Sequence, residues 1–225
     1  VRDRAAIASL AQAWRHEPPC AVGRPWRCWV PACASGEEAY SLAMLLREAQ
    51  DLSGQAPRAV QIYATDLNAA AIAVARKGWY NQQAVVGISQ ERLTRFFMPS
   101  QGGHQVQPDI RAMVMFARHD VITDPPFTRL DLLLCRNVMI YFNATLQRRL
   151  IPLFHFCLRA GGCLVLGSAE TVGRSQNLFK ALLPSSRIYA RSEQRPAPGS
   201  VAFPIHHRPA SPSKEMSVST LPPPP

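Results

Sequence analysis

The stretch that most constrains the fold of this chain runs from Trp26 to Leu46. Trp26 to Pro31 is short, apolar and rich in aromatic and β-branched residues, which is typical of a strand buried on both faces. Small residues follow up to Gly36, and then comes an uninterrupted run of good helix formers whose leucines share one face. The stretch predicts a strand, a tight turn and a helix, the opening unit of a doubly wound α/β sheet.

Acidic residues occupy the first helical positions of this unit. Gly36 is the only glycine in the turn, and Glu37 and Glu38 follow it directly. A phosphate site needs a Gly-rich loop and a free helix N-terminus, so two carboxylates there would repel a pyrophosphate and favour a cation. They would equally complement the helix dipole of any first turn, so this pattern alone leaves both explanations open.

The α/β rhythm continues along the chain with one interruption. Asn68 and Gly78 are expected to cap the two ends of the second helix. A long helix beginning after Asn143 should extend to about Arg159 and be closed by Gly161 and Gly162, although Pro152 should kink it or split it in two. The remaining predicted elements are strands at 59–65, 104–107, 112–118, 130–135, 163–167 and 187–190, and helices at 2–15 and 89–97.

These elements predict an α/β domain over residues 1–191, with a doubly wound, mostly parallel sheet. The rhythm breaks at about 79–111, which we expect to be a small inserted antiparallel β-subdomain. Residues 192–225 hold nine of the 20 prolines and almost no apolar periodicity, so a disordered linker or tail is expected. Because the chain begins at Val1 and reads there like mid-protein sequence, we treat it as a fragment.

Polar groups follow successive predicted strands, at the edge where such a sheet binds its ligands. Asp66 ends the second strand, where an acidic residue accepts hydrogen bonds from ribose hydroxyls. Asp120 follows the third strand, where an adenine amino group could donate to it. Together with the Glu37/Glu38 turn, these positions fit an adenosine-bearing cation without phosphate, which is S-adenosylmethionine. Ordinary helix-start and turn roles are the alternatives for Asp66 and Asp120.

Several motifs go further than this spacing. The sequence resembles the CheR-type chemotaxis receptor methyltransferases, which esterify glutamate side chains of chemoreceptors, over roughly residues 1–190. The resemblance is carried by VPACASGEEAYSLAMLL, IYATDLNAAAIAVARKGWY, FARHDVITDPPF and above all LDLLLCRNVMIYFNATLQRRL. It implies a class I S-adenosylmethionine-dependent methyltransferase fold, protein-glutamate O-methyltransferase activity and chemoreceptor cytoplasmic helices as the partner. The sequence itself has no signal-peptide pattern and no long apolar run, from which we expect a soluble, cytoplasmic protein.

The resemblance also implies roles for individual residues. Arg2 matches the active-site arginine of the family's Phe-Phe-Arg-Asp motif, and Tyr141 matches the tyrosine near the transferred methyl. The residues implied to bind the cofactor are Glu37, Glu38, Asp66, Asp120, Val121, Arg136 and Asn137. The chain departs from the family in lacking the aromatic residues before Arg2 and the preceding helical domain, and in having Ser35 where Thr is common.

Two rival functions remain open. The sequence Asp124-Pro125-Pro126-Phe127 resembles the signature of nucleic-acid amino-methyltransferases, and the net charge of +10 favours the same function. In those enzymes the motif follows the fourth strand, whereas here it precedes the predicted strand at 130–135. We therefore expect a proline turn and no nucleic-acid partner. The other rival is a non-catalytic receptor-docking module of a larger sensory protein.

The cysteines, the potential metal ligands and the apolar runs do not indicate a further functional site. The six cysteines include no CxxC pair and are expected to be buried reduced thiols. No metal-ligand cluster is present, and no apolar run is long enough for direct membrane insertion.

Overall fold

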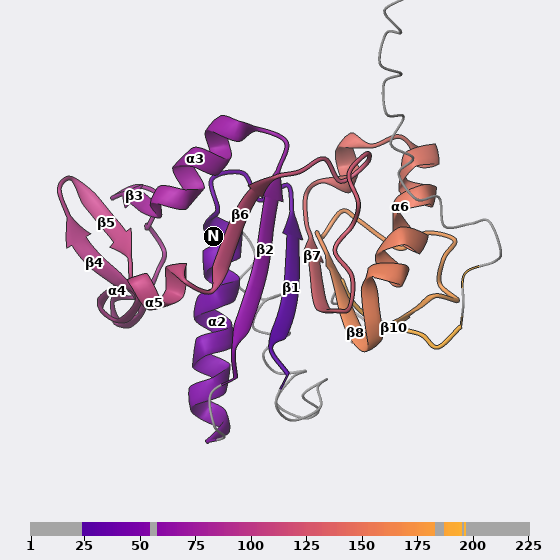
Figure 1. The fold of residues 1–225 in the computed structure, drawn as a ribbon, viewed down its shortest axis with the longest axis horizontal. Helices are drawn as coiled ribbons and strands as arrows, with labels where there is room; N and C mark the ends of the chain where they lie inside the picture. Colours follow the sequence, from indigo (N-terminus) through magenta and orange to yellow (C-terminus); the bar gives the residue numbers. More distant parts are fainter. Residues whose placement is uncertain (1–23, 55–57, 183–186, 195, 197–225) are drawn as a thin grey trace, which may run out of the picture.

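The computed structural model describes residues 24–54, 58–182, 187–194 and 196. Its centre is a seven-stranded sheet of order β6-β2-β1-β7-β8-β10-β9 (Figure 1). The first five strands in this order are parallel, and β10 runs antiparallel to both β8 and β9. The strands are β1 Trp26–Pro31, β2 Val60–Asp66, β6 Val114–Arg118, β7 Leu130–Cys135, β8 Leu158–Leu166, β9 Phe179–Ala181 and β10 Ile188–Arg191.

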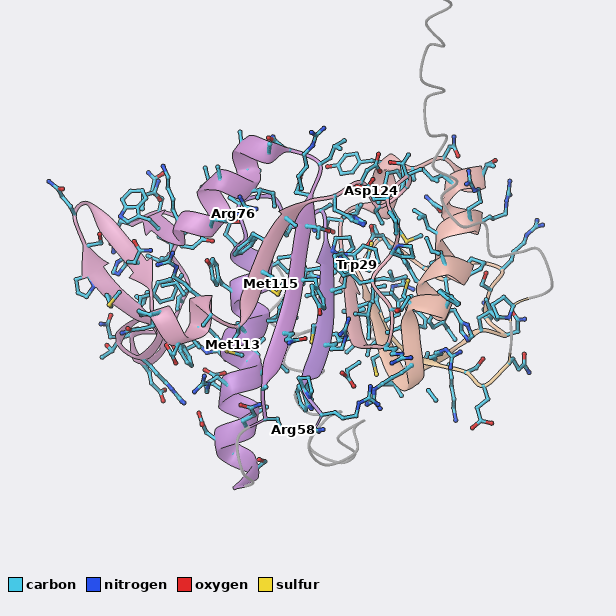
Figure 2. All side chains as sticks on the ribbon, in the orientation of Figure 1. Trp29, Arg58, Arg76, Met113, Met115 and Asp124 are labelled. Atoms are coloured by element: carbon cyan, nitrogen blue, oxygen red, sulfur yellow. The ribbon has the colours of Figure 1, made fainter. Side chains whose placement is uncertain are left out.

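Alternating residues of the central strands send side chains into two separate cores. Cys28, Val30 and Leu132 pack against α2 (Glu37–Ser53), whereas Trp29 and Leu133 pack against α6 (Ala144–Cys157). Figure 2 labels Trp29 on β1 and Asp124 near the end of the sheet at which the parallel strands finish. Helices on both faces of a mostly parallel sheet confirm the predicted doubly wound class.

A second, antiparallel sheet of order β3-β5-β4 lies beyond α3, at the end of the molecule far from α6 (Figure 1). This confirms a small antiparallel sheet where the α/β rhythm breaks, although the extents predicted for the domain and subdomain stay predictions. Its elements and neighbours are β3 Trp79–Asn81, α4 Gln90–Phe96, β4 Phe97–Ser100, β5 Gly103–Val106 and α5 Pro108–Arg111, with α3 Ala69–Lys77 before them.

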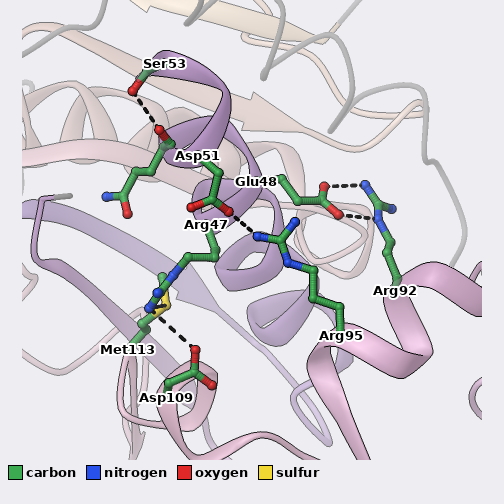
Figure 3. Close-up of polar contacts among 9 residues, drawn as sticks. Arg47, Glu48, Asp51, Ser53, Arg92, Arg95, Asp109 and Met113 are labelled. Carbon is green, nitrogen blue, oxygen red and sulfur yellow. Dashed lines mark hydrogen bonds and ion pairs between the residues drawn. The ribbon is translucent and has the colours of Figure 1, made fainter. Parts of the chain in front are cut away.

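Ion pairs join this part of the chain to α2 (Figure 3). Arg92 on α4 donates two hydrogen bonds to the Glu48 carboxylate, at 2.7 and 2.6 Å. Arg95 pairs with Asp51 one turn further along both helices, and Arg47 lies 3.7 Å from Asp109 on α5. The four residues of the first two pairs recur at a spacing of three on each helix, so one face of α4 lies along one face of α2.

Helix caps explain several boundaries. The Asn68 side chain accepts hydrogen bonds from Ala70 N and Ala71 N, and Gly78 ends α3 with φ of 60°, as predicted. Asn143 caps α6 by accepting from Leu146 N. The predicted split at Pro152 is wrong, because α6 continues as one helix through that residue.

One predicted boundary is wrong. The helix does not extend to 159 and end at the two glycines, because Leu158 already begins β8. Leu158 pairs with Leu130, and the next paired residue is Cys163 opposite Leu132, so the glycines form a bulge within the strand. A Cβ on Gly162 would lie 2.8 Å from Leu130 O, so only glycine fits there.

Candidate functional site

The carboxyl ends of the five parallel strands meet along one edge, which is at the top in Figure 1. The turn from β1 into α2 has an unusual backbone there, with positive φ at Ala32 (52°), Ala34 (47°) and Gly36 (90°). A Cβ on Gly36 would lie 2.9 Å from the Ala75 Cβ and 3.0 Å from the Phe116 ring. The turn therefore lies tightly against α3 and β6, and glycine is required at its end.

Asp66 is held at the end of β2 by two backbone amides. Its Oδ2 accepts from Ala34 N at 2.9 Å and its Oδ1 accepts from Asn68 N at 2.8 Å. The carboxylate therefore joins the β1 turn to the start of α3. Because each carboxylate oxygen has a second lone pair, Asp66 can still accept hydrogen bonds from hydroxyl groups of a ligand.

The two glutamates at the start of α2 are in different environments. The Ser35 hydroxyl donates to both oxygens of Glu37, at 2.8 and 3.0 Å. Glu38 Oε1 instead accepts from Arg136 Nη1 at 2.7 Å, across to the end of β7, and the Arg136 side chain is only 4% exposed. The structure thus brings two of the predicted site residues, Glu38 and Arg136, into direct contact from positions 98 residues apart.

Negative charge collects around this turn. Burial, together with the nearby carboxylates of Asp66, Glu37 and Glu38, which oppose a thiolate, raises the pKa of the Cys33 thiol to about 12. Cys33 is only 4% exposed and its backbone N–H donates to Thr65 O at 2.9 Å. The same field that disfavours an anion at Cys33 favours a cation beside the turn.

Asp120 and Val121 follow β6. Asp120 Oδ1 accepts from Ile122 N at 2.8 Å, and its backbone N–H donates to Asp124 Oδ2 at 2.8 Å, so the carboxylate stabilises a local turn. Val121 is half-buried and packs against the core beneath α6. His119 N donates to Asp66 O at 3.0 Å, which fixes the end of β6 beside the end of β2.

The Asp124–Phe127 sequence belongs to this same loop. Phe127 stacks on Tyr63, with 4.6 Å between ring centroids and 19° between planes, and lies edge-on to Trp29 at 5.3 Å. The aromatic ring is therefore a packing group on the sheet, as expected for a proline turn, and the segment lies before β7.

Asn137 and Tyr141 lie on the turn after β7. Asn137 adopts φ of 56°, and Tyr141 ends a short 3-10 helix, Met139–Tyr141, with 81% of the residue exposed. Arg2 lies outside the described residues, as do the predicted helix at 2–15 and most of the segment after 191.

The sequence reasoning missed Glu170, which lies four residues beyond the end of β8. Its carboxylate is buried and accepts four backbone N–H groups, three of them from the Asn137–Met139 turn. The signal was present, because Glu170 follows the fifth parallel strand as Asp66 and Asp120 follow the second and third.

The described residues contain no group of His, Cys, Asp and Glu that could hold a metal ion. Within the same part of the chain, no helix has the length and hydropathy needed to span a membrane. The five described cysteines, Cys28, Cys33, Cys135, Cys157 and Cys163, are buried free thiols, as predicted.

The residues present fit an adenosine-bearing cation. Their carboxylates gather at one strand edge, Asp66 retains acceptor capacity, and the first turn of α2 bears acidic side chains where a phosphate would need bare amides. These features favour a sulfonium nucleoside over a nucleotide.

A family model described as "CheR methyltransferase, SAM binding domain" matches residues 1–188. An uncharacterized 104.1 kDa protein of Rhodobacter capsulatus is 39% identical over 178 residues, which cover 79% of this chain and 19% of that protein. Chemotaxis protein methyltransferase 1 of Pseudomonas aeruginosa is 35% identical over 175 residues, which cover 76% of this chain and 64% of that protein.

This chain thus spans less than two-thirds of the length of either relative. A solved TehB-like SAM-dependent methyltransferase of Corynebacterium glutamicum is 15% identical, with a TM-score of 0.44 over 84% of this chain and 86% of that one.

Proposed function

This chain belongs to the CheR methyltransferase family and carries its S-adenosylmethionine-binding domain, and from that membership we propose that it methylates glutamate side-chain carboxylates of chemotaxis receptors. The family resemblance expected from the sequence is confirmed, and S-adenosylmethionine is the methyl donor. The observation that carries the proposal is the acidic strand edge, where Asp66 and the Glu38–Arg136 pair surround the turn before α2.

We assign cofactor contacts to the residues at this edge. Asp66 would accept hydrogen bonds from the ribose hydroxyls, while Glu38, with Glu37 beside it, would face the cationic methionine end. Asp120 and Val121 would flank the adenine, and Arg136 and Asn137 would line the site. The bound cofactor supplies an electrophilic sulfonium methyl group.

The acceptor needs alignment more than activation. A glutamate side chain has a pKa of about 4.3 and is already a nucleophilic carboxylate at neutral pH, so no general base is required. The protein must hold that carboxylate in line at near-attack distance and remove part of its water. Arg2 could hold a carboxylate through a bidentate contact, and Tyr141 could present its hydroxyl or ring face to the cationic centre.

The partner in this proposal is the cytoplasmic helical part of a chemoreceptor, with no nucleic acid involved. The net charge of +10 suits an acidic receptor surface. The packing of Phe127 against Tyr63 supports this choice over a nucleic-acid substrate, since that partly buried ring already packs against the core.

A labelled methyl-transfer assay tests the proposal. The chain is incubated with S-adenosylmethionine labelled in the methyl group and with a receptor helix peptide that carries either Glu or Gln at the acceptor positions. We expect base-labile label, released as methanol, on the Glu peptide alone. Tyr141→Phe and Arg2→Ala should slow the transfer, and unchanged rates would remove their assigned roles.

The assay also separates the rival function. A docking module would bind the receptor peptide without labelling it, and that result would contradict the proposed enzyme while keeping the partner.

A further inference from the structure

Glu170 is a buried carboxylate whose partners in the described structure are all backbone amides. It is 4% exposed, and its Oε1 accepts from Val138 N at 2.9 Å and Met139 N at 2.8 Å. Its Oε2 accepts from Asn137 N at 3.1 Å and Gly167 N at 2.6 Å. Among the described residues no basic side chain pairs with it, so these N–H groups carry the stabilisation of the buried charge.

Three of these amides are consecutive and belong to the turn that follows β7. Asn137 has a left-handed φ of 56°, and Val138 is the N-cap of the 3-10 helix Met139–Tyr141. Successive N–H groups in such a turn converge on one point and form an anion-binding concavity. Here the anion is supplied by the chain itself, from the loop after β8, 31 to 33 residues away.

The fit around this carboxylate leaves no spare room. A Cβ on Gly167 would lie 2.7 Å from Asn137 Oδ1 and 2.8 Å from Glu170 Oε2. The ends of β7 and β8 are thus locked together by one side chain and one bare backbone position. Arg136, adjacent to the turn, makes the 2.7 Å contact to Glu38, so the locked segment continues directly into the acidic edge.

We propose that Glu170 is a positioning residue that folds the Asn137–Tyr141 turn into the shape in which Asn137 and Arg136 meet the cofactor and Tyr141 faces the transferred methyl. This role rests on the proposed function of that edge. Glu170 itself touches neither cofactor nor substrate, and acts through the backbone that it holds.

The test compares Glu170→Gln with the same change at an exposed position, Glu193→Gln. In the Glu170 variant the side-chain NH₂ group faces two of the four backbone donors, whichever way the amide is turned. A third variant, Leu153→Ala, removes a buried side chain of α6 and controls for loss of stability alone.

Two quantities are measured on the 225-residue chain. Hydrogen exchange reports the protection of the amides at 137–139 and 167, and needs no ligand. Calorimetric titration with S-adenosylhomocysteine reports the affinity of the folded protein below its unfolding temperature. For Glu170→Gln we expect fast exchange at these amides and an affinity at least about tenfold lower, the size of one or two lost charge-assisted hydrogen bonds.

The expected results distinguish a positioning role of Glu170 from a general loss of stability. Glu193→Gln should match the unsubstituted chain, and Leu153→Ala should unfold at a lower temperature with unchanged affinity. Equal affinity in Glu170→Gln and the unsubstituted chain would overturn the inference, as would an affinity that fell equally in Leu153→Ala. Failure of the unsubstituted chain to bind S-adenosylhomocysteine would instead contradict the proposed function, and this role with it.

Discussion

Asp66 serves the fold and the proposed site with the same two oxygens. Both accept backbone amides, from Ala34 and Asn68, and this fixes the direction in which their remaining lone pairs point. A ligand hydroxyl that donates to such a fixed carboxylate forms a charge-assisted hydrogen bond without loss of side-chain freedom. The residue therefore contributes to binding through its rigidity as well as its charge.

Asp66→Ala should weaken S-adenosylhomocysteine binding by about 10- to 100-fold, since each lost charge-assisted hydrogen bond is worth about 1.5–3 kcal/mol. Asp109→Ala is the matched control, because that carboxylate is 58% exposed on α5, which precedes β6 and lies at the opposite edge of the sheet. Calorimetric titration measures both. An Asp66 variant with the affinity of the control would show that this carboxylate serves only the fold.

Cys33 should be chemically inert although it lies in the turn that bounds the site. With its pKa raised to about 12, only about 1 thiol in 10,000 is a thiolate at pH 8. We expect iodoacetamide at pH 8 to leave Cys33 unmodified in the native chain and to alkylate all six cysteines in denaturant, as read by peptide mass spectrometry. Rapid alkylation of native Cys33 would show that the turn opens to solvent.

At the scale of elements, two ion pairs join α4, which precedes the β4 strand of the small antiparallel sheet, to α2. The Arg92–Glu48 pair is bidentate, and its side chains are 35% and 22% exposed, whereas those of Arg95 and Asp51 are 43% and 49% exposed. A double-mutant cycle of Arg92→Ala and Glu48→Ala, measured by urea unfolding, should give a coupling of about 0.5–1 kcal/mol. The Arg95–Asp51 cycle should give less, because solvent screens that pair more. The reverse order would contradict this account.

His155 makes the packing of α6 sensitive to pH. The residue is fully buried, its Nε2 lies 3.0 Å from Ser192 O, and burial, together with the charge of Arg191, lowers its pKa. Below pH about 6.5 the unfolded chain binds a proton at His155 that the folded chain does not, so the free energy of unfolding falls as the pH drops.

The unfolding temperature should therefore decrease more between pH 7.5 and 5.5 in the unsubstituted chain than in His155→Gln, which retains a donor for Ser192 O. Thermal unfolding at both values measures the difference. Equal decreases in the two chains would mean that His155 does not contribute to this pH dependence.

The sequence correctly predicted the helices and strands whose ends are determined by residues close to those ends in the chain. Asn68 and Gly78 cap α3 as expected, and β7 has the bounds read from its apolar run. The sequence predicts that the helix after Asn143 continues to about Arg159, but Leu158 already pairs with Leu130 in the sheet. Tertiary pairing thus overrode local preference.

In the candidate site, too, local features could be predicted from the sequence and long-range contacts could not. Each strand-end carboxylate could be found from its place after an apolar run, as Asp66 was. The contacts that organise the edge could not, because Glu38 meets Arg136 and Glu170 meets the Asn137–Met139 turn across long stretches of sequence. Glu170 was harder still, since its partners are backbone amides and leave no complementary side chain to recognise.

At the scale of the whole molecule, the net charge is positive whereas the candidate site is acidic. The chain has a net charge of +10, yet the edge where five parallel strands end collects the carboxylates of Asp66, Glu37 and Glu38 around one turn. A basic protein with an acidic strand edge can attract an acidic partner at long range and still select a cationic or uncharged nucleoside over a nucleotide at short range.

Ligand-induced stabilisation tests this selectivity on the intact chain. A ligand that binds only the folded state raises the free energy of unfolding by about 2.7 kcal/mol at 100 times its Kd. For a domain of this size that corresponds to a rise in Tm of about 5–10 °C. S-adenosylhomocysteine should produce such a saturable rise, because its adenosine meets Asp66 and it carries no phosphate.

ATP at equal concentration is the matched ligand, since it shares the adenosine but brings a triphosphate toward Glu37 and Glu38. We expect it to shift Tm by less than about 1 °C, because like charges near the low-dielectric turn repel. Equal stabilisation by the two ligands would mean that the first turn of α2 tolerates phosphate, and that its acidic residues only complement the helix dipole. Stabilisation by S-adenosylhomocysteine alone would assign to these glutamates the exclusion of phosphate-bearing nucleosides on a fold that elsewhere binds nucleotides.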